Sequence, residues 1–90
     1  MEKVIIVSEE NHGTIFVAAN EEAAKRALLE TDWVDNYSSI YMEDRVNEFN
    51  NHFLSLEEIY GENWQEAFMG FNAEQMENMG FYFREVEVYN

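Results

Sequence analysis

Cysteine and proline are both missing from this chain of 90 residues, and only four residues are glycine. The absence of cysteine excludes disulfides, thiolate metal ligands and a cysteine nucleophile. The absence of proline, of serine- and glycine-rich linkers and of internal repeats indicates one continuous folding unit. We therefore expect a single domain over residues 1–90.

Basic residues are also scarce. The chain has 5 Lys plus Arg against 19 Asp plus Glu, which gives a formal net charge of −14. Five cations cannot form the basic surface on which nucleic-acid-binding proteins depend, so we expect no direct contact with nucleic acid. No apolar run approaches the ~20 residues of a membrane span and no signal segment opens the chain, so we expect no membrane association and a cytoplasmic location.

Apolar residues are nevertheless plentiful. They make up 47% of the chain, and aromatic residues make up 16%. Disordered acidic tails are poor in aromatic residues, so this composition favours a folded domain with a packed core.

Short runs of β-branched residues predict strands at both ends of the chain. Residues 3–8 are apolar at both alternating positions, which is typical of a strand covered on both faces. A polar turn leads to a returning strand over residues 14–18. Residues 81–89 predict the last strand, in which the apolar parity shifts between Phe83 and Val86. That shift indicates either a bulge or two partly covered faces.

A helix is predicted over residues 20–30, with Asn20 as its N-cap. Acidic residues in its first turn match the helix dipole. Two pairs of oppositely charged side chains lie four residues apart and are expected to support the helix: Glu21 with Lys25, and Glu22 with Arg26.

The middle of the chain predicts further helices. Residues 31–40 show no periodic pattern and are expected to be irregular. The apolar residues that follow recur at helical spacing and predict a helix over residues 41–53: Met42, Val46, Phe49 and Phe53. Capping-box patterns mark the starts of two more short helices, at Ser55 and at Asn72, with another helix between them over residues 62–69.

The element order is therefore strand, strand, helices, strand. This order indicates an α+β fold, with a three-stranded antiparallel sheet and the helices packed on one face. The last strand is expected to pair with one member of the first hairpin, and the sequence does not decide which member.

The chain contains no recognisable pattern of catalytic or ligand residues. His12 and His52 are isolated from each other and from other ligand residues in the sequence. Residues 32–36 lack the oxygen spacing of a calcium loop, and the isolated glycines form no phosphate-binding loop. We therefore expect a protein that is not an enzyme and that holds no cofactor and no metal.

The acidic surplus is uneven along the chain. Residues 1–26 hold five acids and three bases, whereas residues 27–90 hold fourteen acids and two bases. Solubility of a small domain needs a net charge of only roughly 2–8, so we interpret the excess as a surface for a cationic partner. The surplus of the second segment matches the phosphate charge of ~20 Å of duplex. The acids expected to bind the partner are Asp32, Asp35, Glu43, Asp44, Glu48, Glu57, Glu58, Glu62, Glu66, Glu74 and Glu77.

Aromatic side chains beside these acids are candidate interface anchors, because Tyr and Trp are enriched at binding hot spots. The candidates are Trp33, Tyr37, Tyr41 and Tyr60.

In size, charge and lack of catalytic motifs, the chain resembles the small, acidic, cysteine-free proteins that phages and mobile elements encode against host defences. These include many anti-CRISPR proteins, the uracil-DNA glycosylase inhibitor and the anti-restriction DNA mimics. The resemblance implies a non-enzymatic inhibitor that acts in a bacterial host cell by DNA mimicry. The implied partner is a basic host protein: a defence nuclease such as a CRISPR effector, or its nucleic-acid complex.

Two alternatives remain open. Tyr60-Gly61-Glu62-Asn63, followed by Trp64 and Ala67, is similar to a segment of the barstar family of ribonuclease inhibitors, and implies a nuclease-toxin inhibitor. In that family the segment opens a helix whose acids plug the ribonuclease active site, and Gln65 stands here where the family has its first inhibitory aspartate. The other alternative is a generic protein-interaction or regulatory module that forms a homodimer through an exposed sheet edge.

Because we expect no metal site, addition of millimolar calcium or magnesium should leave the melting temperature unchanged. An ion that binds only the folded state raises the melting temperature by mass action. Thermal unfolding followed by circular dichroism, with and without each ion, measures this effect. A rise with either ion would show that the acidic residues do form a metal site.

Overall fold

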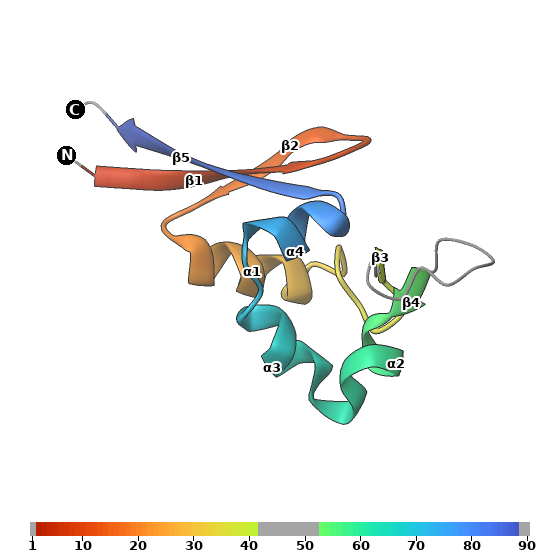
Figure 1. Cartoon of the computed structure of the whole chain (residues 1–90). Coiled ribbons are helices and arrows are strands. Elements are labelled where there is room, and N and C mark those ends of the chain that lie inside the picture. Colours follow the sequence, from red (N-terminus) through yellow and green to blue (C-terminus); the bar gives the residue numbers. More distant parts are fainter. Residues whose placement is uncertain (1, 42–52, 89–90) are drawn as a thin grey trace.

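The computed structural model describes residues 2–41 and 53–88 (Figure 1). In these residues the expected α+β fold is confirmed, with a three-stranded antiparallel sheet and the helices packed on one of its faces. A second sheet has two short antiparallel strands. The elements in chain order are β1 (Glu2–Glu9), β2 (Gly13–Ala18), α1 (Glu21–Glu30), β3 (Ser39–Tyr41), β4 (Phe53–Ser55), α2 (Leu56–Tyr60), the 3₁₀ turn η2 (Gly61–Asn63), α3 (Trp64–Met69), α4 (Ala73–Asn78) and β5 (Phe81–Val88).

Strand β1 is the centre of the larger sheet, whose strand order is β2-β1-β5. The last strand therefore pairs with the first strand, which settles the pairing that the sequence left open. The register between β1 and β5 runs along both strands without a shift, so a bulge in the last strand is the wrong explanation for its parity. The irregularity lies instead between β1 and β2, where the register shifts between Val7 and Ser8.

The parity of β5 shifts because its apolar residues change from the inner face of the sheet to the outer face between Phe83 and Val86. Phe83 packs against the core, and Val86 lies opposite Val4 on the face that points away from the helices. Strand β1 is covered unequally: Ile5 is 3% exposed, whereas Val4 is only half-buried. The expectation that β1 is covered on both faces is therefore wrong for the described residues, in which the helices cover only the inner face (Figure 1).

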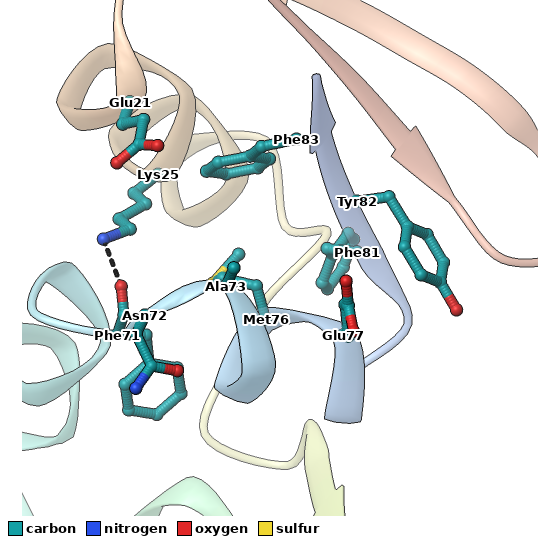
Figure 2. Close-up of a pocket in the computed structure, with 10 residues that line it drawn as sticks. All are labelled: Glu21, Lys25, Phe71, Asn72, Ala73, Met76, Glu77, Phe81, Tyr82 and Phe83. Carbon is teal, nitrogen blue, oxygen red and sulfur yellow. Dashed lines mark hydrogen bonds between the residues drawn. The ribbon is translucent and has the colours of Figure 1, made fainter. Parts of the chain in front are cut away.

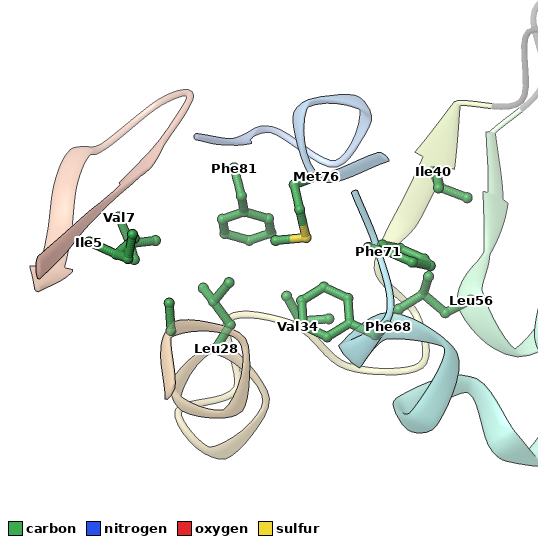
Figure 3. Packing of buried hydrophobic residues seen from close by; sticks show 11 residues of the cluster. Ile5, Val7, Leu28, Val34, Ile40, Leu56, Phe68, Phe71, Met76 and Phe81 are labelled. Carbon is green, nitrogen blue, oxygen red and sulfur yellow. The ribbon is translucent and has the colours of Figure 1, made fainter. Parts of the chain in front are cut away.

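The core joins the inner face of the sheet to the helices (Figure 3). Val7 of β1, Leu28 of α1 and Phe68 of α3 are each 0% exposed. The same apolar cluster includes Ile5, Ala24, Val34, Ile40, Leu56, Phe71, Met76 and Phe81. One apolar cluster of the described residues therefore spans the sheet and the helices.

The helix starts follow the capping patterns of the sequence. The side chain of Asn20 accepts a hydrogen bond from the backbone N–H of Ala23 at 2.8 Å, which caps α1. Asn72 and Gln75 form the expected capping box of α4. The helix expected over residues 62–69 begins as the turn η2 and continues as α3.

The segment after α1 differs from the sequence-based expectation. Residues 39–41 were expected to be irregular or to start a helix, but they form β3 and pair with β4, with Ile40 opposite Leu54. Phe53, expected on the apolar stripe of the 41–53 helix, lies in β4. The remaining stripe residues, Met42, Val46 and Phe49, lie outside the described residues.

The structure differs from the expected charge pattern of α1 at Lys25. Lys25 was expected to pair with Glu21 at the surface, but it is 7% exposed. Its Nζ donates hydrogen bonds to the carbonyl oxygens of Met69 at 3.1 Å and Phe71 at 2.6 Å. The C-terminal end of a helix carries free carbonyl groups and a partial negative charge, which suits an ammonium group. The second expected pair does form, with Arg26 Nη2 2.7 Å from Glu22 Oε1.

We expect Lys25→Met to lower the free energy of unfolding by about 2 kcal/mol. The substitution leaves two carbonyl groups without their donor, and relief of the buried charge offsets only part of that loss. Urea unfolding measures the change. Arg26→Met is the matched control, because it removes only an exposed ion pair worth under ~0.5 kcal/mol. Equal effects of the two substitutions would show that the contacts of Lys25 do not hold α1 to α3.

Candidate functional site

The candidate site is drawn from the exposed acids that the helices, the turn η2 and the turn after α1 carry. We call it the acidic helical layer and define it by eight exposed residues: Asp32, Asp35, Glu57, Glu58, Glu62, Glu66, Glu74 and Glu77. Three further candidates from the sequence, Glu43, Asp44 and Glu48, lie outside the described residues.

Short helices bring the acids of this layer to the surface. Glu57 and Glu58 lie in the first turn of α2, Glu66 in the first turn of α3 and Glu74 in the first turn of α4. Carboxylates are favoured there by the helix dipole. Part of the acidic surplus therefore has a structural reason, because each helix start is stabilised by an acidic residue.

The acidic helical layer is not neutralised by neighbouring bases within the part of the chain that the structure describes. Residues 53–80 contain no Lys and no Arg. The ion pairs found among the described residues join Lys3 to Glu85, Arg26 to Glu22 and His12 to Glu9. All three lie on the sheet, its hairpin or α1, so the negative charge of the layer is left for solvent or for a partner.

A shallow hollow lies where the turn after α1 meets the start of α2. It has a volume of about 340 Å³ and is lined by Asn36, Tyr37, Ser55, Glu57 and Glu58. Asn36 Nδ2 donates to Glu57 Oε2 at 2.6 Å, which links the turn to α2. We call this feature the Tyr37 hollow. It brings two acids of the layer next to an aromatic side chain.

Tyr37 is 80% exposed and is the candidate anchor that the structure leaves free. The Trp33 ring packs against the core and meets the His12 ring edge-on, with centroids 5.2 Å apart. Tyr60 also packs against the core, and its ring centroid lies 5.6 Å from that of Phe71. The main role of Trp33 and Tyr60 is therefore to pack against the core. The side chain of Tyr41 lies outside the described part.

Some of the acids also hold the local backbone. Asp35 Oδ1 accepts the backbone N–H of Tyr37 at 3.0 Å, and Glu58 accepts the backbone N–H of Ser55 at 3.1 Å. Asp32 has a φ of +62°, a conformation that L residues other than Asn and Asp rarely adopt. By contrast, Glu62 and Glu66 make no side-chain hydrogen bond within residues 2–41 and 53–88, so their substitution tests binding with little effect on folding.

A pocket of about 150 Å³ lies between α1, α4 and β5 (Figure 2). Its walls include Met76, Phe81 and Phe83, with Glu21 and Glu77 among the lining residues. The buried ammonium group of Lys25 points to the Phe71 carbonyl rather than standing free. Sequence reasoning missed this role of Lys25. The available signal was its spacing of three residues from Leu28, which places both on one side of the helix.

One carboxyl group outside the layer has a shifted pKa. A hydrogen bond with His12 lowers the pKa of Glu9, and the backbone N–H of Asn11 at 3.0 Å adds to this effect against the opposing influence of burial. Glu9 ends β1 and belongs to the hairpin, so this interaction stabilises the turn between β1 and β2.

Two negative findings concern the described residues alone. They contain no cluster of three His, Asp or Glu side chains placed to hold a metal ion. None of their helices has both the length and the apolar character needed to cross a bilayer.

We expect Ser55→Ala to lower the free energy of unfolding by about 1 kcal/mol, because it removes the hydrogen bond from Glu58 N–H to Ser55 Oγ at 3.2 Å. Thermal or urea unfolding measures this loss. Glu66→Ala serves as the control and should change stability by less than ~0.5 kcal/mol. If Ser55→Ala is equally neutral, the capping box does not hold the Tyr37 hollow in place.

Comparison with known proteins yields no relative from which a role for these residues is transferred. No protein-family model, curated protein sequence or solved structure matches the chain.

Proposed function

We propose that the protein is a non-enzymatic inhibitor that binds the cationic nucleic-acid groove of a host defence nuclease, such as a CRISPR effector. In this proposal the acidic helical layer takes the place of nucleic-acid phosphates, and the protein acts in the cytoplasm of a bacterial host cell. The observation that carries the proposal is the set of eight exposed carboxylates, for which the described residues supply no neutralising base.

The amount of charge fits this role. Duplex DNA carries one negative charge per ~1.7 Å of its axis, so eight carboxylates equal the charge of about 14 Å of duplex. A surface of one sign attracts an oppositely charged groove, accelerates the encounter and loses strength as salt screens it. Under this proposal, the negative charge that exceeds what solubility requires serves to attract the basic groove of the nuclease.

The Tyr37 hollow adds a specific contact to this general attraction. An exposed tyrosine beside carboxylates can stack on an arginine guanidinium group while the acids bind its N–H groups. Arginine and tyrosine are common among the residues that dominate binding energy. We therefore place the centre of the interface at Tyr37, Glu57 and the neighbouring acids.

The double charge reversal Glu62→Lys/Glu66→Lys should weaken nuclease inhibition by at least about tenfold at low salt, because it introduces like-charge repulsion against a basic groove. The measurement is DNA cleavage by a purified RNA-guided nuclease, titrated with the protein at low and at high salt. A barnase-type ribonuclease in the same assay tests the barstar-like alternative.

The matched control is Glu2→Lys/Glu10→Lys, which changes the charge equally but lies in β1 and in the turn that follows it, outside the acidic helical layer. Inhibition lost in the helical variant and kept in the control supports the proposal. The acidic helical layer is not the binding surface if both variants inhibit equally well. The proposal is also wrong if the unchanged protein does not inhibit the RNA-guided nuclease at any salt concentration, and inhibition of the ribonuclease alone would favour the barstar-like alternative.

A further inference from the structure

The pocket between α1, α4 and β5 combines buried apolar residues with exposed charged ones (Figure 2). Phe71, Met76 and Phe81 are 5%, 2% and 4% exposed, whereas Glu21 and Glu77 are exposed. The pocket has a volume of about 150 Å³. An apolar cavity of about that volume in an engineered protein holds a benzene molecule. The pocket, which we call the Met76 pocket, is therefore large enough for one small ring or a short alkyl chain.

The two carboxylates of the Met76 pocket come from different helices. Glu21 lies in the first turn of α1, and Glu77 lies in α4. No ion pair within residues 2–41 and 53–88 involves either of them. Their negative charges are therefore left for solvent or for a ligand of the pocket.

Lys25 also lines the pocket, but its ammonium group is already bound. Its Nζ donates hydrogen bonds to the carbonyl oxygens of Met69 and Phe71. Figure 2 shows this group turned toward the Phe71 carbonyl and away from Met76 and Phe83. A lysine stem can cover apolar surface while its charged end is bound elsewhere. The lining is net negative, because two carboxylates outnumber one ammonium group.

The charge of the lining decides which ligand fits. An anion is repelled by the two carboxylates and by a chain of net charge −14. A cation is attracted by both, and it also gains from the rings of Phe81 and Phe83, because the face of an aromatic ring attracts a positive charge within about 6 Å. Charge complementarity therefore favours a cation whose remaining part is apolar.

We propose that the Met76 pocket binds a small organic cation, an ammonium or guanidinium group on a short apolar body. The apolar body packs against Met76 and Phe81, which are buried, and the cationic group binds the carboxylates of Glu21 and Glu77, which are exposed to solvent. This arrangement keeps the charge of the ligand hydrated and removes only its apolar part from water. The inference does not depend on the proposed function.

Three probes of similar size and different charge test the inference on the unchanged protein: benzylammonium, benzyl alcohol and benzoate. The measurement is an NMR titration that follows the methyl signal of Met76, which lines the pocket and is 2% exposed. Benzylammonium should shift this signal to saturation with a dissociation constant of about 1 mM, as small ligands do. Benzyl alcohol should bind about fivefold more weakly, and benzoate should bind no more tightly than the alcohol.

Glu21→Gln/Glu77→Gln should weaken benzylammonium binding about fivefold and leave benzyl alcohol binding unchanged, because it removes the charges and keeps the apolar lining. Glu30→Gln/Glu74→Gln is the matched control. It removes two carboxylates from the same two helices, and neither residue lines the pocket. This control should bind benzylammonium like the unchanged protein. Ala73→Leu adds volume at an exposed lining residue and should weaken the binding of both probes.

The inference is overturned if none of the probes shifts the Met76 signal at concentrations up to about 20 mM. It is also overturned if benzyl alcohol or benzoate binds as tightly as benzylammonium. Equal weakening of benzylammonium binding in the two charge variants would assign the binding to the overall charge of the chain and would overturn it as well. None of these results bears on the nuclease assay, because Glu62 and Glu66 do not line the pocket.

Discussion

Burial of the inner face of β1 is the constraint on which the rest of the structure depends. Ile5 and Val7 lose nearly all contact with water because Leu28 and the other apolar residues of the helices pack on the same side of the sheet. The helices of the described part cover that side alone. Two surfaces follow from this arrangement: an acidic one on the helices, and an apolar one on the outer side of the sheet.

The two surfaces differ because charge and apolar area are separated in the fold. Acids are favoured at the starts of the short helices α2, α3 and α4, where the helix dipole stabilises them. The sheet has apolar residues on both of its faces, and its charged residues include both acids and bases. Lys25 is the exception among the charges, because its ammonium group binds backbone carbonyls inside the structure.

The sequence predicted part of the candidate site for local reasons. The positions of Glu57 and Glu58 follow from the capping box at Ser55, whose hydrogen bonds span only three residues. The difference between exposed Tyr37 and the packed rings of Trp33 and Tyr60 was not predictable, since it depends on contacts with distant elements. The hydrogen bond between Asn36 and Glu57 joins residues 21 positions apart and leaves no sequence pattern.

The amino-acid sequence alone determined the α+β class, the helix caps and the excess of acids, because these depend on composition and on interactions within about one helical turn. Tertiary structure alone decided the strand order β2-β1-β5, the pairing of β3 with β4 and the burial of Lys25. It also decided that one face of β1 is covered by helices and the other is open. These features depend on which apolar surfaces meet across long stretches of chain, and many pairings satisfy the same local pattern until the core selects one.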